Sequence, residues 1–252
     1  MADRGETALA FMRETRGAVA DRVEEHPLGT LLATPSLDRV WSLNALSVSG
    51  ARPDLTLDGL EAALLDAFGD ARWASVELHD AATAARIEAE ARARGWTVEH
   101  EVVMDLRREP DRVVDTPPVR EGTREEMLAL ADRWFAEDVE SQGPEALTQL
   151  RAYARREWDA RPTRAFVAGD AEAMTKLWSD GSTAQVEDVY TSPQARGQGY
   201  ARALVTRAIQ EARGAGHDLI FIVADADDTP KELYARLGFD PLHAITRVVR
   251  RS

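Results

Sequence analysis

The second half of the chain alternates between hydrophobic patterns of helical and of strand-like period. Apolar residues at helical spacing predict helices, and shorter apolar runs bounded by turn residues predict strands. The predicted elements, in chain order, are a helix at Arg124–Ala136, a helix at Pro144–Trp158, strands at Thr163–Ala168, Ala173–Ser179 and Ala184–Thr191, a helix ending near Gly214, a strand at Leu219–Ala224, a helix at Thr229–Leu237 and a last strand. Strands that alternate with helices predict a layered α/β domain (α+β) with a mixed sheet.

Local signals support several of these boundaries. Thr123 followed by Glu126 is a capping-box pattern at the start of a helix. Pro144 stands in a first-turn position, where its missing N–H costs nothing. Asp180-Gly181 between two strand-like runs predicts a hairpin.

The first half carries a faint copy of the same design. The segment ending at Met104 (ARARGWTVEHEVVM) resembles the segment ending at Arg247 (YARLGFDPLHAITR), at an offset of 143 residues. A charged, proline-bearing stretch (RREPDRVVDTPP) lies between the halves and predicts an extended linker. We therefore expect two copies of one supersecondary arrangement.

Composition excludes several classes of protein. The 252 residues have a formal net charge of −13, which argues against nucleic acid as a partner and suits an acidic cleft for cationic substrates, or merely solubility. There is no cysteine, no apolar run long enough to span a membrane and no apolar core typical of a signal peptide near the N-terminus. A cytoplasmic protein without membrane partners is expected. No cluster has metal-ligand spacing, and the scarcity of lysine (Lys176 and Lys231 only) is interpreted as compositional bias.

The most informative stretch is VEDVYTSPQARGQGYARALVTRAI, residues 186–209. A strand ends at Thr191, and Gly197 and Gly199 precede a new helix. Glycines allow a tight turn, and the free N–H groups at a helix start form an anion site that needs no special side chain. The dinucleotide fingerprint is excluded because Arg202 stands where its third glycine belongs, and the P-loop is excluded because Gly-Lys-Ser/Thr is absent.

Arg196-x-x-Gly199-x-Ala201 resembles the acetyl-CoA pyrophosphate loop of the GNAT superfamily of N-acetyltransferases. Upstream, residues 186–193 look like the family's fourth strand, and downstream Leu233-Tyr234-x-x-x-Gly238-Phe239 looks like its closing signature. The three motifs come in the family's order. The resemblance implies the GNAT fold, with the sheet splayed between two central strands, and acetyl-CoA as co-substrate without a metal.

The resemblance also assigns cofactor contacts. Main-chain amides of the loop would hold the pyrophosphate, and the end of the preceding strand would pair with the pantetheine arm like an added strand. Arg196 would contact a phosphate or pair with a nearby carboxylate. Asp227 occupies a position that the family often fills with an Asn that contacts CoA. The expected cofactor-binding residues are Val189, Tyr190, Thr191, Arg196, Gly197, Gln198, Gly199, Tyr200, Ala201, Arg202 and Asp227.

Two residues are the catalytic candidates. Tyr234 sits where the family often places the tyrosine that protonates the departing thiolate, and a packed aromatic is the alternative. Glu187 and Asp188 resemble the acidic pair of the spermidine/spermine acetyltransferases, so both are candidate substrate contacts and Glu187 is the candidate base. A salt-bridged strand carboxylate is the alternative for Glu187. Gln185, where other family members put a base, cannot serve as one. Consecutive strand residues point to opposite faces, so we expect these two carboxylates to diverge.

If the repeat is real, residues 1–112 are a degenerate GNAT-like domain without a cofactor loop, 113–118 are a linker, and 119–252 are the catalytic GNAT domain. Opposite the phosphate loop stands the segment 49–54, which contains Pro53, and opposite Tyr234 and Glu187 stand Ala91 and Asn44. The fold expected is therefore two GNAT-like domains in tandem.

These observations predict an N-acetyltransferase that moves acetyl from acetyl-CoA to a primary amine of a small molecule or peptide by direct attack. The alternatives are a transferase that uses another acyl-CoA and a non-catalytic acyl-CoA-binding sensor. The acceptor's identity and the choice between monomer and homodimer stay open.

Overall fold

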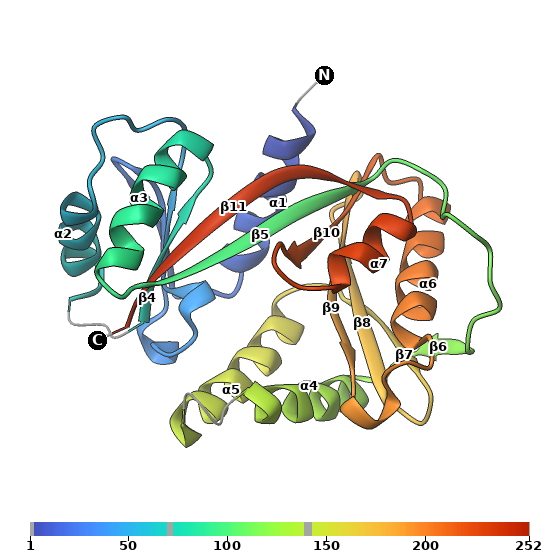
Figure 1. Ribbon diagram of the computed structural model, residues 1–252. Helices are drawn as coiled ribbons and strands as arrows, with labels where there is room; N and C mark the ends of the chain where they lie inside the picture. Colours follow the sequence, from blue (N-terminus) through green and yellow to red (C-terminus); the bar gives the residue numbers. More distant parts are fainter. Residues whose placement is uncertain (1–2, 70–72, 139–142, 252) are drawn as a thin grey trace.

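We describe a computed structural model of the chain, which covers residues 3–69, 73–138 and 143–251. The C-terminal half contains every element that the sequence predicts, with ends shifted by at most a few residues (Figure 1). Its elements are β6 (Val119–Glu121), α4 (Arg124–Asp138), α5 (Pro144–Ala160), β7 (Arg164–Ala168), β8 (Ala173–Ser179), β9 (Thr183–Thr191), α6 (Tyr200–Gly214), β10 (Leu219–Asp225), α7 (Pro230–Arg236) and β11 (Phe239–Arg251).

The predicted helix and turn signals are confirmed in atomic detail. Thr123 N–H donates to Glu126 at 2.9 Å, and Glu126 N–H donates to the Thr123 hydroxyl oxygen at 3.2 Å, which is a capping box. At the hairpin between β8 and β9, the Asp180 carboxylate accepts from Thr183 N–H at 2.8 Å. These local bonds explain why the sequence sets the ends of the elements.

The N-terminal half repeats much of this order. Its elements are α1 (Arg4–Gly17), β1 (Arg22–His26), β2 (Gly29–Ala33), short 3-10 turns at Pro35–Leu37 and Trp41–Leu43, β3 (Ala45–Val48), α2 (Leu57–Phe68), β4 (Trp73–Leu78), α3 (Ala81–Ala93) and β5 (Thr97–Leu106). In both halves antiparallel strands come first and are followed by a parallel pair joined by one helix, β3-α2-β4 in the first half and β9-α6-β10 in the second. A further helix, α3 or α7, then leads to a long last strand, β5 or β11. The structure thus confirms the predicted duplication.

The two halves exchange their last strands. A single sheet of eleven strands in the described part of the chain has the order β1-β2-β3-β4-β11-β5-β10-β9-β8-β7-β6. Strand β11 of the second half pairs with β4 and β5, while β5 of the first half pairs with β10. The two long antiparallel strands bridge the lobes in Figure 1, and the C-terminus lies beside the first half. The sequence did not predict this exchange, and the domain boundaries at 113–118 stay a prediction.

Helices cover both faces of this sheet. In the second lobe, α6 and α7 pack on one face through a core that includes Val186, Leu204, Ile222 and Phe239. Helices α4 and α5 cover the opposite face, and α1 of the first half packs beside them through Phe11, which meets Phe221 of β10 edge-on at 5.7 Å. The first half therefore contributes a helix to the second half's lobe.

None of the described helices is both long enough and apolar enough to cross a membrane.

A buried ion-pair network crosses the exchanged strands. Arg247 of β11 is 2% exposed and pairs with Glu77 of β4 at 2.8 Å and with Glu101 of β5 at 2.6 Å. Its guanidinium also lies 4.4 Å from the ring centroid of Trp41. Glu77 bonds Arg16 of α1 as well, at 2.5 Å. Because these partners come from four elements, the network fixes where α1 lies on the sheet.

Substitution of Arg247 by Leu is expected to lower the free energy of unfolding by about 3–5 kcal/mol, because buried carboxylates lose their cation. Urea denaturation of the full chain measures this. Arg250→Leu on the same strand is the control, since its pair with Glu61, at 3.5 Å, is more exposed and contributes about 1 kcal/mol or less. Equal losses in the two variants would contradict a central role for the network.

Candidate functional site

Strands β9 and β10 pair only along part of their length. Parallel pairing runs from Thr183 opposite Leu219 to Val186 opposite Ile222, and β9 then continues to Thr191 without β10 as a partner. The corresponding pair in the first half, β3 and β4, stays paired up to Val48 opposite Leu78, where β3 ends. The splay that the GNAT resemblance implied is therefore present in the second half, and it leaves main-chain groups of β9 without a neighbouring strand.

A bulge in β9 lies beside this opening. The register with β8 shifts between Met174 opposite Tyr190 and Lys176 opposite Glu187, so two residues of β9 face one of β8. Asp188 lies in the bulge with φ +53°, a left-handed conformation that is uncommon outside glycine. The Glu187 carbonyl accepts from the Thr175 hydroxyl at 2.9 Å, which helps to hold the distorted backbone.

The bulge overturns one expectation about the acidic pair. Asp188 pairs with Lys176, whose amino group also bonds Glu157 of α5 at 2.5 Å, and Glu157 lines the same pocket as Glu187. Both carboxylates thus lie on the α5 side of the sheet, and the prediction that they point to opposite faces is wrong. Strict alternation holds only for a regular strand, and the inserted residue breaks it.

Charge balance at this place is unusual. Burial alone would lower the pKa of Lys176, but the carboxylates of Asp188 and Glu157 raise it, so the amine stays protonated. Burial, together with the negative charges of Asp188 and Glu157, raises the pKa of Glu187 to about 8. The interpretation of lysine scarcity as compositional bias overlooked Lys176, although a lysine within a predicted strand of an Arg-rich chain was an available signal.

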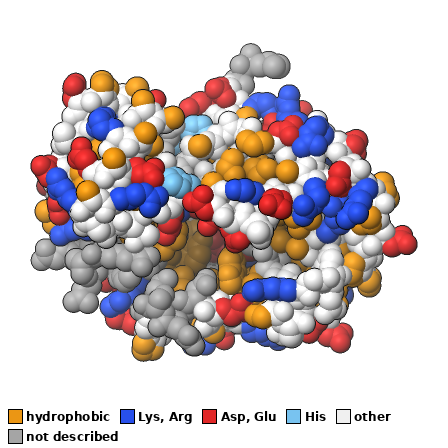
Figure 2. Space-filling model, in the orientation of Figure 1, with side chains coloured by type: hydrophobic (Ala, Val, Ile, Leu, Met, Phe, Trp, Pro, Cys, Tyr) orange, Lys and Arg blue, Asp and Glu red, His pale blue; other side chains and the backbone are white. Residues whose placement is uncertain are grey.

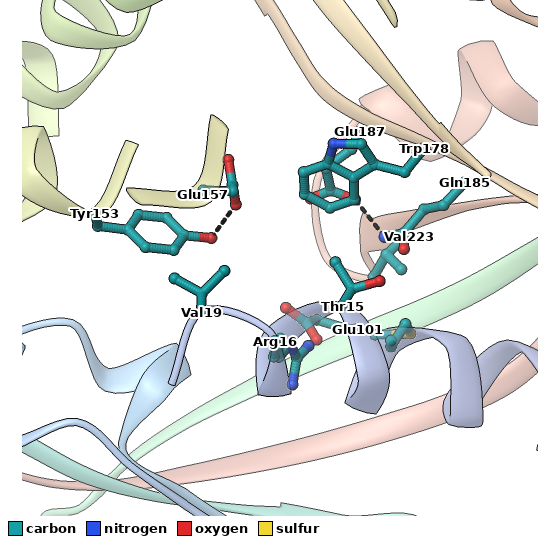
Figure 3. A pocket seen from close by; sticks show the side chains of 11 residues that line it. Thr15, Arg16, Val19, Glu101, Tyr153, Glu157, Trp178, Gln185, Glu187 and Val223 are labelled. Carbon is teal, nitrogen blue, oxygen red and sulfur yellow. Dashed lines mark hydrogen bonds between the residues drawn. The ribbon is translucent and has the colours of Figure 1, made fainter. Parts of the chain in front are cut away.

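The pocket itself lies between the two halves (Figure 3). Its volume is about 90 Å³. The first half supplies the lining residues Met12, Thr15, Arg16, Val19 and Glu101, and the second half supplies Tyr153, Glu157, Trp178, Gln185, Glu187 and Val223. Sequence reasoning identified only Glu187 among them as a site residue. No local motif marks the others, since they meet through α1 and the exchanged β5.

The surface of the molecule is consistent with a site between the lobes. Figure 2 shows it hollowed near the centre of the view, with hydrophobic side chains inside and acidic side chains close to the edge. Some of the acidic side chains behind the net charge of −13 thus lie around this region.

Tyr234 lies on α7, in the core on the other face of the sheet. Its ring is 6% exposed and meets Phe239 edge-on at 6.4 Å. Burial raises the pKa of Tyr234, and the charges of Glu187 and Asp228 raise it further, so the hydroxyl holds its proton through neutral pH. Among the described residues its hydroxyl has no hydrogen-bond partner, so it is free to donate.

The loop between β9 and α6 exposes main-chain donors. Gly197 and Gly199 have φ of +78° and +83°, which favours glycine at both positions. Gly199 is the N-cap residue of α6, and within the described chain no side chain caps this helix. The first amide bonded inside the helix is that of Ala203, which donates to Gly199 O at 3.1 Å. The amides of residues 197–202 are therefore available to an anion, as at other helix starts.

Helix α2, the counterpart of α6 in the first half, begins differently. The Thr56 hydroxyl accepts from Gly59 N–H and the Glu90 carboxylate accepts from Leu57 N–H, each at 3.2 Å. Asn44 is buried and bonds the main chain around it, for example Thr34 N–H at 2.8 Å. The first turn of α2 thus uses its donors internally.

The remaining expected contacts lie around the loop. Arg196 pairs with Glu137 at 3.1 Å, which is the carboxylate alternative, and Glu137 also accepts from the Tyr190 hydroxyl. Asp227 lies 3.1 Å from Nδ1 of His100 on β5, at the junction of the halves. The structure therefore gives both Arg196 and Asp227 a partner within the chain, and their contacts with a cofactor stay predictions.

Two lobes of one mixed-sheet design, of which one has an opened sheet and an uncapped helix start, define an α/β protein of the acyltransferase class. Residues 126–239 match the model of the acetyltransferase (GNAT) family. The C-terminal half thus contains a GNAT acetyltransferase domain, as the three motifs predicted.

Known proteins agree with this assignment. A mycothiol acetyltransferase of Beutenbergia cavernae is 30% identical over 122 residues, which cover 46% of this chain and 40% of that protein, so the match spans well under half of the relative. A GCN5-related N-acetyltransferase from Kribbella flavida shares the fold over 100% of this chain and 97% of its own, with a TM-score of 0.60 and 21% identity. A tandem GNAT protein from the clavulanic acid biosynthesis pathway superposes with a TM-score of 0.52 and 17% identity, covering 81% of this chain and 74% of its own. The duplicated fold is thus shared across the whole chain.

Gly197→Ala is expected to weaken CoA binding at least tenfold, since a Cβ at positive φ strains the loop whose amides face the phosphates. Titration calorimetry with CoA measures the dissociation constant. Gly216→Ala is a matched control, because Gly216 has φ +80°, has open space around it and lies after the other end of α6. Equal affinity in both variants would show that the loop does not hold the ligand.

Proposed function

We propose that this chain transfers the acetyl group of acetyl-CoA to a primary amine of a small molecule or peptide, by direct attack within a ternary complex. The observation that carries the proposal is the uncapped start of α6 at the end of β9, where β9 has parted from β10. Free amides there suit a diphosphate, and the unpaired strand edge suits the amides of a pantetheine arm. The residues expected to hold the pyrophosphate are Gly197, Gln198, Gly199, Tyr200, Ala201 and Arg202, with Val189 and Thr191 on the strand.

The two catalytic candidates have complementary properties. A protonated amine cannot attack a thioester, so a base must take its proton, and Glu187 in the pocket fits that role. The amine nitrogen then bonds the acetyl carbon, the C–S bond breaks, and Tyr234 gives its proton to the leaving sulfur. A carboxylate with a raised pKa accepts a proton more readily, and a phenol with a raised pKa stays protonated until it is needed. No covalent acyl-enzyme is proposed, because the chain has no cysteine and no pattern for another nucleophile.

The retained Glu187 and Tyr234 favour an enzyme over a non-catalytic acyl-CoA sensor. A sensor needs the phosphate loop but neither a base in an adjoining pocket nor a proton donor beside it. Thiol release from acetyl-CoA with a panel of amines separates the two: the sensor would bind acetyl-CoA without turnover on any amine.

Glu187→Gln is expected to shift the pH dependence of kcat/KM to higher pH. In the natural chain the ionised base accumulates as pH rises through about 8, so kcat/KM should rise there. Without it, the rise should follow the ionisation of the amine itself, near ~10 for an alkylamine such as lysine. Initial rates between pH 6.5 and 10 measure the profile, and Glu211→Gln, on α6 and outside the pocket lining, is the control. An unmoved profile would reject Glu187 as the base.

Tyr234→Phe is expected to lower kcat by roughly 10²-fold, the usual scale of general acid catalysis. The ring still fills the core against Phe239, so folding should be kept, and thermal unfolding with CoA present checks this. A variant that binds CoA normally and turns over at the natural rate would remove Tyr234 from the mechanism.

A further inference from the structure

The pocket between the halves contains a polar atom that lacks a partner. Gln185 is 4% exposed, and its amide nitrogen donates to Glu187 (Figure 3). Its carbonyl oxygen Oε1 is buried and has no hydrogen-bond partner in the described part of the chain. A buried acceptor without a donor is costly, so Oε1 indicates a ligand that brings an N–H or O–H.

The charge around the pocket indicates which donor is missing. Each lining carboxylate except Glu187 has a cation beside it within the described chain: Glu101 pairs with Arg247, and Glu157 pairs with Lys176. Arg16, the lining cation, is already paired with Glu77, and Lys176 is shared with Asp188. Arg247 also meets Glu99 at 3.7 Å, and Arg161 donates to Thr15, so the described cluster holds six carboxylates against four cations. A protonated amine would supply both the charge that Glu187 lacks and the donor that Gln185 lacks.

The rest of the pocket offers no site for a second charge. The phenol of Tyr153 donates to Glu157, and the indole N–H of Trp178 donates to Thr163 at 3.1 Å, so neither polar group of these rings is left for a ligand. Met12, Val19 and Val223 complete the lining as hydrophobic side chains. Among the described residues Arg16 is paired, and Arg161, which donates to the Thr15 hydroxyl and lies 5.3 Å from the Trp178 ring centroid, still leaves more carboxylates than cations around the pocket. A carboxylate on the acceptor would therefore add to an excess of negative charge.

Size limits the acceptor as well. The cavity volume of about 90 Å³ suits a small acceptor. The walls are α1 on one side and α5 on the other, and α1 is fixed by the buried pair between Arg16 and Glu77. A folded protein's terminus or a long peptide would have to displace this helix.

We infer that the acceptor is a compact primary amine whose other atoms are uncharged, held by Gln185 Oε1 and Glu187 between α1 and α5. This inference rests on the proposed function and narrows it: free amino acids, which carry a carboxylate, and peptides are disfavoured. The first half of the chain thereby belongs to the acceptor site, through Met12, Thr15, Val19 and Glu101.

The test compares n-butylamine with 4-aminobutanoate as acceptors for the full chain, with acetyl-CoA and detection of released thiol. The two have the same chain length and amines of similar basicity, so they differ in the carboxylate alone. We expect kcat/KM for butylamine to exceed that for 4-aminobutanoate at least a hundredfold, with triglycine as poor as the acid. Acetylation of the acid or of the peptide at an equal or higher rate would overturn the inference and leave the proposed function standing. If no acceptor in the panel releases thiol, the proposed function fails instead.

A variant isolates the role of Gln185. Gln185→Met keeps the length of the side chain but removes both amide groups, and it is expected to raise KM for butylamine about tenfold or more while KM for acetyl-CoA stays the same. Gln210→Leu, at an exposed position on α6, is the control. Thermal unfolding with CoA shows whether the Gln185→Met chain is folded, and Gln185→Asn, which keeps the amide, is measured if it is not. An unchanged KM for butylamine in a folded variant would contradict the assignment.

Discussion

The antiparallel pairing of β5 with β11 is the constraint on which the rest of the structure depends. These two long strands lie in the middle of the sheet, and each is flanked by a strand of the opposite half. A strand without neighbours leaves its main-chain donors and acceptors unpaired, so neither half can complete its sheet from its own residues. Arg247 adds a buried charge whose partners lie on β4 and β5. If β11 paired with other strands, this charge would be buried without a counter-ion. The two halves are therefore one cooperative unit in spite of their duplicated design.

This constraint explains why a half without an acetyl-CoA loop is retained. The exchanged strand β5 places Glu101 in the pocket, and α1 packs against β10 of the other half. In a duplicated protein, one copy can lose the cofactor contacts and still shape the acceptor side of the other copy's site. In the first half, Thr56 and Glu90 occupy the first-turn amides of α2, and β3 stays paired with β4 to its end, so the open features of the second half are missing there. The same secondary structure thus forms the proposed cofactor site in one half and has its corresponding donors used internally in the other.

Much of the second half could be predicted from sequence because its signals are local. A capping box, a proline in a first turn and an Asp-Gly hairpin each act within a few residues. The glycines of the loop before α6 likewise predict its tight turn from the sequence itself. The bulge at Asp188 had no such signal. Its left-handed conformation depends on the pairing of β9 with β8 and on Lys176 beneath it, so the faces of the acidic pair were predicted wrongly. The exchange of β5 and β11 could not be predicted from the sequence for a similar reason. A strand that pairs within its own half and one that pairs with the other half bury the same alternating residues, so the hydrophobic pattern does not distinguish them.

The acceptor pocket follows from both of these long-range features together. The bulge turns Asp188 toward Lys176, which leaves Glu187 without a cation of its own, and the exchange brings α1 over that carboxylate. Without α1 the carboxylate of Glu187 would be less buried, and without the bulge Asp188 would not add its negative charge on this face, so the pKa of Glu187 would be lower. Burial by the first half and repulsion from Asp188 and Glu157 instead raise its pKa to about 8. The half of the chain that lacks the cofactor loop thereby tunes the group proposed as the base, and the division of labour between the halves is electrostatic as well as structural.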